Sequence, residues 1–165
     1  MVCPICLQEN DIRTVRTTAT QKIKRDIVEA SIECSVCSSC HEEFWTAAQL
    51  ESNLEAFRSV YRSSHGIMSP QEIVALRQKY DVSQKTLGKL LDIGELTINS
   101  YEQGALPSGA HNNLLRFIAH LFNFQELFER NKGKLSELQI RKIADRLNKL
   151  TQDETPSTQA YHATN

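Results

Sequence analysis

The pattern of hydrophobic and polar residues changes once along the chain, from a strand-like to a helix-like repeat. Over residues 12–33, Thr, Val and Ile recur at alternate positions with charged residues between them, which is typical of a solvated antiparallel β-ribbon. From about residue 46 onwards, apolar residues recur every three or four positions, as on the buried face of a helix. The sequence therefore predicts a mainly α fold with a small β module at its N-terminal end.

Two of the predicted helices begin with clear capping signals. Residues 46–49, Thr-Ala-Ala-Gln, have the form of a capping box, and the apolar face that follows predicts a helix over residues 47–62. Residues 69–72, Ser-Pro-Gln-Glu, open the next helix with a cap, a proline at its first position and a capping glutamate. The Ser-Ser-His-Gly segment between these helices predicts a hinge, and we place a domain boundary near His65.

The segment over residues 83–104 carries the strongest local pattern of the chain. Ser83 is a good N-cap, and leucines follow it at the i, i+3, i+4 spacing of a short helix. An Asp-Ile-Gly sequence then breaks the period, and we expect its glycine, Gly94, to adopt a positive φ. Ile98 and Tyr101 restart the apolar stripe three residues apart. Two short helices joined by a glycine-containing turn are therefore predicted, which is a helix-turn-helix.

A second helix anchored by Ile98 and Tyr101 must point its other residues outward, and in a helix-turn-helix these face a DNA major groove. The predicted groove-facing residues are Glu95, Leu96, Thr97, Asn99 and Ser100. Gln84 and Lys85 open the first helix, where an amide, an ammonium group and free backbone N–H groups can hold phosphate oxygens of double-stranded DNA. The alternative is an ordinary helical hairpin inside an all-α core.

Two further helices and a tail are predicted downstream. The first runs through residues 114–128 and has more apolar residues than one buried stripe needs, so it is either deeply buried or in contact with a second subunit. The second covers residues 135–150, and its basic face is expected to be solvated. Residues 151–165 have no apolar pattern and are rich in Thr, Gln and Ser, which predicts a disordered tail.

Length and charge add limits to this picture. The 165 residues suit two small domains, which we place at residues 1–64 and 65–150. A net charge of −1 gives no general attraction to nucleic acid, so any DNA affinity must come from a local basic surface. No apolar run approaches the roughly 20 residues of a membrane span, and the N-terminus has no apolar signal core, so we expect a cytoplasmic protein without a membrane partner.

Five cysteines give the N-terminal part its candidate chemistry, and an odd number cannot all form disulfides. They lie in one C-x-x-C pair, Cys3 and Cys6, and in two overlapping pairs further along, Cys34, Cys37 and Cys40. Each C-x-x-C turn is called a knuckle below. Zn²⁺ takes four ligands in a tetrahedron, so one pair from each end closes a structural site. We choose Cys37 and Cys40 because the predicted strand still runs near Cys34, which leaves Cys34 as a spare thiol.

The sequence leaves two alternatives to this set of ligands. His41, directly after Cys40, is an alternative ligand, although adjacent residues rarely turn to one metal without strain; free or redox-active cysteines are the other alternative. So small a sheet has too little core to stand alone, and Zn²⁺ is expected to supply much of its folding free energy. Four thiolates would fill the coordination shell of the metal and leave no open position for a substrate. The sequence also contains no His-Glu-x-x-His, nucleophile elbow or phosphate loop, so we expect that the protein is not an enzyme.

Two resemblances follow from these motifs. The patterns S-Q-x-x-L-G-x-x-L and I-x-x-Y-E-x-G within residues 83–104 resemble the helix-turn-helix of the Cro and lambda-repressor (XRE) family, whose DNA-binding unit has five helices. With the two knuckles ahead of it, the chain resembles the MqsA-like (YgiT-type) antitoxins. That resemblance implies a zinc-binding N-terminal domain that engages a toxin, a C-terminal domain that forms a homodimer on an inverted-repeat operator, and repression of its own operon. A zinc-containing XRE-type regulator of phage or mobile-element type, without a toxin partner, is the alternative.

The chain departs from the pattern of these antitoxins at three points. The glycine that often follows each knuckle is Leu7 and His41 here, so we expect less tight knuckles. Leu96 and Ser100 stand where a family member aligned without gaps has an Asn and an Arg, so the operator sequence cannot be carried over. The predicted last helix goes beyond the family's usual end and has no assigned role.

Overall fold

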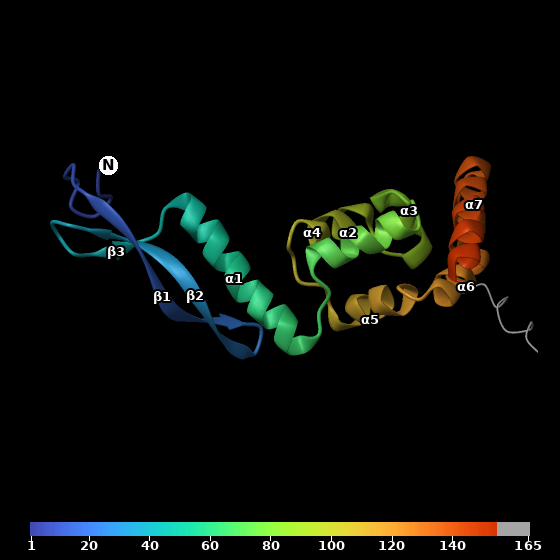
Figure 1. Cartoon of the computed structure of the whole chain (residues 1–165), viewed down its shortest axis with the longest axis horizontal. Coiled ribbons are helices and arrows are strands. Elements are labelled where there is room, and N and C mark those ends of the chain that lie inside the picture. Colours follow the sequence, from blue (N-terminus) through green and yellow to red (C-terminus); the bar gives the residue numbers. More distant parts are fainter. Residues whose placement is uncertain (155–165) are drawn as a thin grey trace, which may run out of the picture. The chain divides into compact units, whose positions relative to one another are not determined.

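A long antiparallel hairpin begins the fold (Figure 1). Its strands β1 (Ile12–Ile23) and β2 (Asp26–Cys37) pair along their whole lengths, and a short strand β3 (Glu43–Phe44) pairs with the other edge of β2. The predicted alternation is visible in β2, where Val28, Ala30 and Ile32 are buried and the residues between them are exposed. The computed structural model describes residues 1–154, which divide into two compact units on either side of the Ile67–Met68 bond.

Helix α1 (Ala47–His65) packs against β2 and covers the apolar face of the first unit. It begins at the predicted capping box, in which the Thr46 hydroxyl accepts from the Gln49 N–H and the Gln49 side chain accepts from the Thr46 N–H. The side chain of Asn53, which is 2% exposed, bonds to both the N–H and the carbonyl of Glu33, at 3.0 and 2.8 Å. Asn53 thereby pairs with the backbone N–H and carbonyl of Glu33, which lie on the edge of β2 beyond the short β3, as a neighbouring strand would.

The second unit is helical throughout its described part. Its elements are α2 (Pro70–Lys79), α3 (Gln84–Leu91), α4 (Glu95–Glu102), α5 (Gly109–Ile118), α6 (Leu121–Asn131), the 3₁₀ turn η1 (Lys132–Lys134) and α7 (Glu137–Glu154). Helices α2 to α6 match in number the five helices that the resemblance to the XRE family implies. The expected fold class, mainly α with a small β module, is confirmed.

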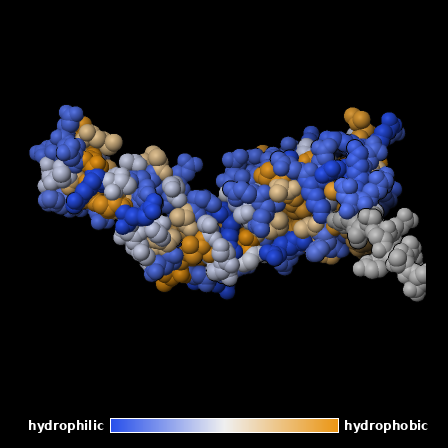
Figure 2. Space-filling view, in the orientation of Figure 1, coloured by the Kyte–Doolittle hydropathy of each residue, from blue (hydrophilic) through white to orange (hydrophobic). Residues whose placement is uncertain are grey.

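One core cluster holds the helices of the second unit together. The rings of Tyr80 and Phe124, both fully buried, stack with centroids 3.6 Å apart and planes within 7°. On the face that Figure 2 shows, hydrophilic residues cover most of the surface of this unit, with hydrophobic residues in small groups between them. Of the helices described, none is long and apolar enough to cross a bilayer.

The single helix expected over residues 114–128 is in fact two, α5 and α6, with a break at Ala119 and His120. Side chains at the end of α2 donate hydrogen bonds to the backbone carbonyls at this break. The Tyr80 hydroxyl donates to the carbonyls of Ile118 and Ala119, at 2.8 and 3.2 Å, and the Lys79 ammonium donates to the carbonyl of Ala119. Two helices present two buried faces, which accounts for most of the surplus of apolar residues in this segment.

Two further expectations about the second unit are corrected. Asp92, and not Gly94, adopts the positive φ that ends α3: φ is 55° at Asp92 and −60° at Gly94, which is the N-cap of α4. The last helix is longer than expected, because residues 151–154 continue α7 as helix and do not begin the tail. The rest of the predicted tail, residues 155–165, lies outside the described residues.

Candidate functional site

The first knuckle is a tight turn at the N-terminal end of the first unit. The Leu7 N–H donates to the carbonyl of Cys3 at 2.9 Å, which closes the turn, and the Ile5 N–H points at Cys3 Sγ at 3.4 Å. The second knuckle repeats this arrangement at the end of β2. There the His41 N–H donates to the carbonyl of Cys37 at 3.1 Å. The Ser39 N–H points at Cys37 Sγ at 3.4 Å.

The residues in place of the family glycines do not loosen the knuckles, contrary to expectation. Leu7 and His41 both adopt left-handed backbone, with φ of 60° and 59°. This is the conformation that glycine accepts most readily, and a residue with a Cβ adopts it at a cost of about 1–2 kcal/mol. Each turn nevertheless closes with its backbone hydrogen bond, so the contacts of the knuckles outweigh the local strain.

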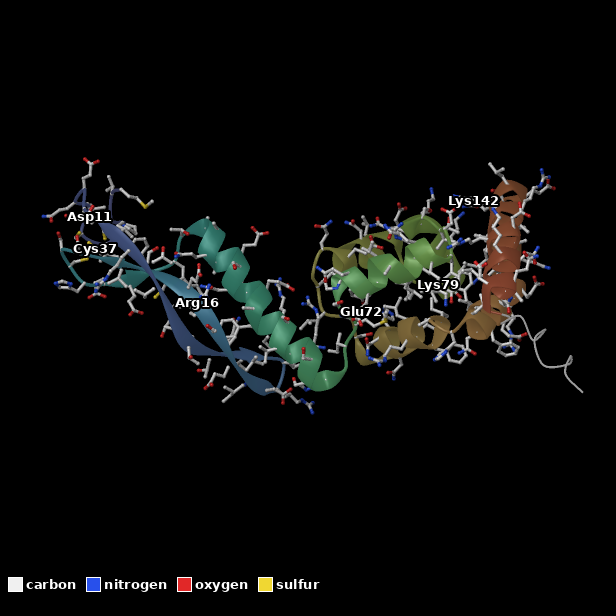
Figure 3. The ribbon with its side chains drawn as sticks, viewed as in Figure 1. Asp11, Arg16, Cys37, Glu72, Lys79 and Lys142 are labelled. Carbon is white, nitrogen blue, oxygen red and sulfur yellow. The ribbon has the colours of Figure 1, made fainter. Side chains whose placement is uncertain are left out.

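The two knuckles bring four sulfurs together. Cys3, Cys6, Cys37 and Cys40 have Sγ atoms that all lie within 4.8 Å of one another. Figure 3 shows Cys37 among the side chains at the end of the sheet where the knuckles meet. The Sγ–Sγ distances are 3.8 Å for Cys3 with Cys40 and 3.8 Å for Cys6 with Cys37. Four sulfurs placed about 2.3 Å from a central Zn²⁺ in a tetrahedron would be about 3.8 Å apart, so the group fits such an ion.

The surroundings of the sulfurs shift their acidity in opposite directions. Backbone N–H groups of Cys40 and Ser39 lower the pKa of the Cys37 thiol from 9.0 to about 6. For Cys40, the N–H of Glu42 acts to lower the pKa, but burial and the neighbouring sulfurs raise it to about 12. A bound cation would favour the deprotonated form of all four.

The other two candidate ligands lie outside the four-sulfur group. Cys34 is buried within β2, and its Sγ is 3.7 Å from a carboxylate oxygen of Glu43. Burial and the charge of Glu43 raise the pKa of this thiol, which disfavours the thiolate that a metal needs. His41 is exposed after its left-handed turn. The structure therefore gathers the four cysteines that the sequence analysis chose.

The helix-turn-helix is formed by α3 and α4, which pack closely against each other. Its tightest point is Gly88, where a Cβ would lie only 2.5 Å from the carbonyl oxygen of Ile93. Only glycine lets α3 approach the turn this closely. Leu87 and Ile98 are fully buried on the facing sides of the two helices. The predicted apolar stripe thus fixes which face of α4 points outward.

The residues predicted to face DNA occupy the outer side of α4 and the start of α3. Leu96 is 82% exposed, and Glu95 and Lys85 are exposed as well. Thr97, Asn99 and Ser100 are half-buried, and the Ser100 hydroxyl donates to the carbonyl of Thr97 at 2.9 Å. Gln84 is also half-buried, and its amide donates to Glu102 at 2.7 Å and to Asn99 at 3.4 Å.

Sequence reasoning missed the ion pair that holds this arrangement. The Arg77 guanidinium on α2 donates to both carboxylate oxygens of Glu102 at the end of α4, and also to the carbonyl of Val82. The Glu102 side chain is only 6% exposed. Burial alone would raise its pKa, but hydrogen bonds from Arg77 and Gln84 lower it instead. The glutamate of the Y-E-x-G pattern was the available signal, although nothing in the sequence named its partner.

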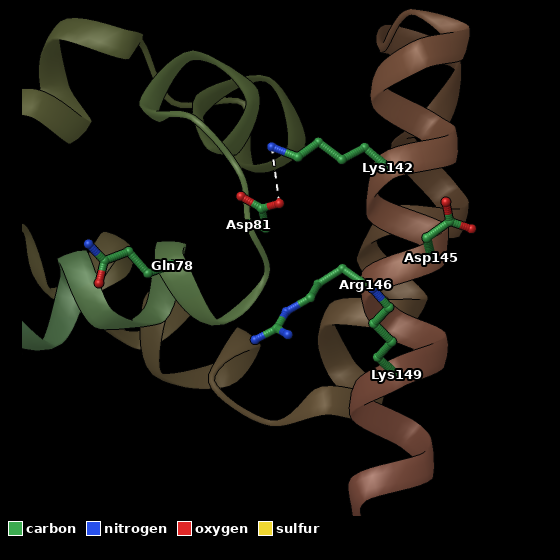
Figure 4. A pocket seen from close by; sticks show the side chains of 6 residues that line it. All are labelled: Gln78, Asp81, Lys142, Asp145, Arg146 and Lys149. Atoms are coloured by element: carbon green, nitrogen blue, oxygen red, sulfur yellow. Dashed lines mark ion pairs between the residues drawn. The ribbon is translucent and has the colours of Figure 1, made fainter.

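Helix α7 contacts the helix-turn-helix and the end of α2. Gln139 donates to the Thr86 hydroxyl of α3 at 2.8 Å. Lys142 pairs with Asp81 at 3.1 Å (Figure 4). Arg146 donates to the carbonyl of Lys79 at 2.8 Å. These bonds border a shallow pocket between α7 and the end of α2, lined by Gln78, Asp81, Lys142, Asp145, Arg146 and Lys149. The basic face expected to be solvated is therefore partly engaged with the fold.

The chain matches a protein-family model. The model described as the antitoxin component of bacterial toxin-antitoxin system, MqsA, matches residues 1–132. The curated proteins and the solved structures compared with the chain gave no match. The matched residues include both knuckles and the whole helix-turn-helix, while α7 follows them. Because the match covers well over half of the chain, the protein belongs to the family of MqsA, the antitoxin component of a bacterial toxin–antitoxin system.

Proposed function

We propose that this protein is a sequence-specific DNA-binding antitoxin that represses its own operon, binds a toxin and carries one structural Zn²⁺. The observation that carries the DNA-binding part is the outward face of α4, which stands on a tightly packed helix-turn-helix within an antitoxin-family chain. We place the protein in the cytoplasm, where its operator and a reducing environment are found.

DNA recognition is assigned to α3 and α4. Helix α4 enters the major groove with Glu95, Leu96, Thr97, Asn99 and Ser100 toward the base edges. Leu96 makes an apolar contact, for which a thymine methyl is the natural partner, while the short polar side chains offer few strong bidentate pairs. Specificity therefore depends also on DNA shape and on phosphate contacts.

The phosphate contacts are assigned to the start of α3. Lys85 is exposed there, beside the N–H groups of the first helical turn. Gln84 presents its amide next to Asn99 and Glu102, so it can hold a phosphate only with donor capacity not used in those bonds. We therefore give Lys85 the larger share of phosphate affinity.

A homodimer through the second unit is proposed because one helix-turn-helix reads too few base pairs for useful specificity. Two phenylalanines near the α5–α6 break are unusually exposed, Phe117 at 55% and Phe122 at 70%. A two-fold dimer through this surface would bury both rings. Dimers of helix-turn-helix units read inverted repeats whose half-sites lie about one helical turn, roughly 34 Å, apart.

The zinc site and toxin binding are assigned to the first unit. The thiolate group of Cys3, Cys6, Cys37 and Cys40 would hold Zn²⁺ and tie the two knuckles to each other. The described core of this unit is small, essentially one hairpin under one helix, so the metal contributes a large part of its folding free energy. A toxin partner follows from the family, and we propose that it engages this unit.

The test combines DNA footprinting with co-expression. Purified protein should protect an inverted repeat upstream of its own reading frame, and co-expression should neutralise a growth-inhibiting protein encoded beside it. Protection without any inhibiting neighbour would favour the regulator without a toxin partner. No protection anywhere in its own promoter region, with a folded zinc-loaded sample, would reject autorepression.

A further inference from the structure

Asn10 lies between the two knuckles and contacts both. Its side-chain nitrogen Nδ2 is 3.7 Å from Cys6 Sγ in the first knuckle and 3.7 Å from Cys37 Sγ in the second. These distances suit N–H···S hydrogen bonds, which are longer than those to oxygen. One amide group thus contacts two sulfurs that belong to different parts of the sequence.

A second contact fixes which end of the amide faces the sulfurs. The Ser39 hydroxyl donates to Asn10 Oδ1 at 2.7 Å. The backbone of Asn10 is also held on both sides, because its N–H donates to the carbonyl of Met1 and its carbonyl accepts from the amino terminus. Thiolates accept hydrogen bonds and cannot donate them, so the reversed amide would set an oxygen against two negative sulfurs. The orientation with Nδ2 toward the sulfurs is the only one that satisfies every partner.

From this geometry we propose that Asn10 is a positioning residue of the metal centre, with Ser39 as its support. The inference rests on the proposed zinc site. Four thiolates around one divalent cation leave a net negative charge, and the positive end of the Asn10 amide stabilises that charge at two of them. The Ser39–Asn10–sulfur chain also joins the knuckles by hydrogen bonds, so the four sulfurs are held near their bound positions by the protein itself.

The proposal makes a quantitative claim about metal retention. Groups that hydrogen-bond to metal ligands typically change metal affinity by roughly 10- to 100-fold when they are removed. Asn10→Ala should weaken Zn²⁺ binding within that range. Asn10→Asp keeps the shape but turns a carboxylate toward the sulfurs, so it should weaken binding at least as much. Ser39→Ala, which leaves the backbone of Asn10 in place, should have a smaller effect in the same direction.

The experiment uses the full-length protein and a chromophoric chelator that competes for Zn²⁺. Ser38→Ala is the matched control, since Ser38 is the exposed neighbour of Ser39 in the same knuckle and its bond to the carbonyl of Asp11 uses the backbone N–H. A second readout is the sulfur-to-cobalt absorption of the Co²⁺-loaded protein. Loss of N–H···S bonds raises the energy of the sulfur electrons, so this band should move to longer wavelength in Asn10→Ala and stay fixed in Ser38→Ala.

The outcomes separate this inference from the function it rests on. Wild-type protein that fails to bind Zn²⁺ overturns both. Zinc-loaded wild type together with unchanged affinity in the Asn10→Ala and Asn10→Asp proteins overturns the inference alone. Full rescue by Asp of a defect seen with Ala also overturns it, because shape rather than hydrogen bonding would then be what matters. If Asn10→Ala does not fold, the milder Ser39→Ala decides by the same two readouts.

Discussion

Arg77 and Glu102 form a bidentate ion pair that joins the C-terminal half of α2 to the end of α4. The guanidinium Nε is 2.7 Å from one carboxylate oxygen, and Nη2 is 3.0 Å from the other. Gln84 donates to the same carboxylate from the start of α3. Three helices thus meet at one carboxylate, and the direction in which α4 presents its outer face depends on it.

Replacing Glu102 by Gln should lower the free energy of unfolding of the second unit by about 1–3 kcal/mol, because Arg77 loses a charged partner at a largely buried position. The Arg77 side chain is 21% exposed, so water screens part of the loss and the larger values seen for fully buried pairs do not apply. Urea denaturation followed by helix signal measures the change. Glu126→Gln on the exposed side of α6 is the control and should leave stability nearly unaltered.

The same carboxyl predicts a pH dependence. Its folded-state pKa lies below the ordinary value of 4.5, so the stabilisation is fully present above about pH 4.5 and is lost as the pH falls through the folded pKa. The stability difference between the wild type and Glu102→Gln should therefore shrink as the pH is lowered below about 4.5. A difference that stays constant down to pH 3 would contradict the role given to this ion pair.

Gly88 should tolerate no side chain. In Gly88→Ala the new Cβ would lie 2.5 Å from the carbonyl oxygen of Ile93, a backbone atom that cannot move without opening the turn. We expect the free energy of unfolding of the second unit to fall by about 1–3 kcal/mol. DNA binding should become weaker as well. Gly109→Ala is the matched control, because no atom lies within 4 Å of its added Cβ at the start of α5. There the change should be neutral or stabilising by about 0.4–1 kcal/mol.

The choice of zinc ligands is tested by two cysteine variants. Cys37→Ser should lose Zn²⁺ and unfold the first unit, since its sulfur belongs to the four-sulfur group. Cys34→Ser should keep one Zn²⁺ per chain, because the Cys34 sulfur faces Glu43 instead. Elemental analysis of the purified proteins decides. Loss of zinc from Cys34→Ser would mean that Cys34 is a ligand and that the choice of Cys37 and Cys40 over Cys34 and Cys37 is wrong.

The dimer surface is tested by polar substitutions near the α5–α6 break. Phe117→Ser combined with Phe122→Ser should convert a two-fold dimer to a monomer in light scattering at micromolar concentration, since both rings are more than half exposed in the single chain. Leu138→Ser is the control, because Leu138 is also a highly exposed apolar residue, at 76%, but lies on α7. A wild-type protein that is already monomeric, with one half-site protected on DNA, would exclude this dimer.

Features that depend on a few neighbouring residues were accessible to sequence reasoning. The capping boxes at Thr46 and Ser69 form as predicted, and so does the N-cap at Ser83, because each needs only a side chain and a backbone N–H three residues away. The four-sulfur group was also foreseen. There the tetrahedral preference of Zn²⁺ links two distant segments, and this supplies the long-range information that periodicity lacks.

Features set by contacts between distant segments were missed. The break between α5 and α6 depends on the Tyr80 hydroxyl, which arrives from α2 to take the carbonyls of Ile118 and Ala119. The left-handed backbone of Asp92 is hidden at the sequence level, because Gly94, two residues later, is the residue type that most favours a positive φ. Likewise Leu7 and His41 adopt a conformation that their side chains disfavour, and only the closing of each knuckle explains why.

The assignment of α4 as the DNA-reading helix predicts that phosphate contacts and base contacts come from different residues. Lys85 is exposed at the start of α3, where it meets phosphate, so Lys85→Ala should weaken binding to all sequences alike. It should also lower the slope of log affinity against log salt by about 0.9, the value for one phosphate. Lys22→Ala, an exposed cation on β1, is the control for removal of charge elsewhere and should leave the slope unchanged.

Substitutions on the outer side of α4 should act differently. Asn99→Ala and Ser100→Ala should alter base preference at one or two operator positions by roughly 1–3 kcal/mol each, because base edges carry the sequence information. Asn99 also accepts a hydrogen bond from Gln84. The Asn99→Ala substitution should therefore free the Gln84 amide to bind phosphate. This would partly offset the drop in DNA affinity without restoring the base preference. Binding titrations against single-base operator mutants at two salt concentrations separate the two effects. If Lys85→Ala changed base preference while the α4 substitutions changed neither affinity nor preference, α4 would not be the helix that reads DNA.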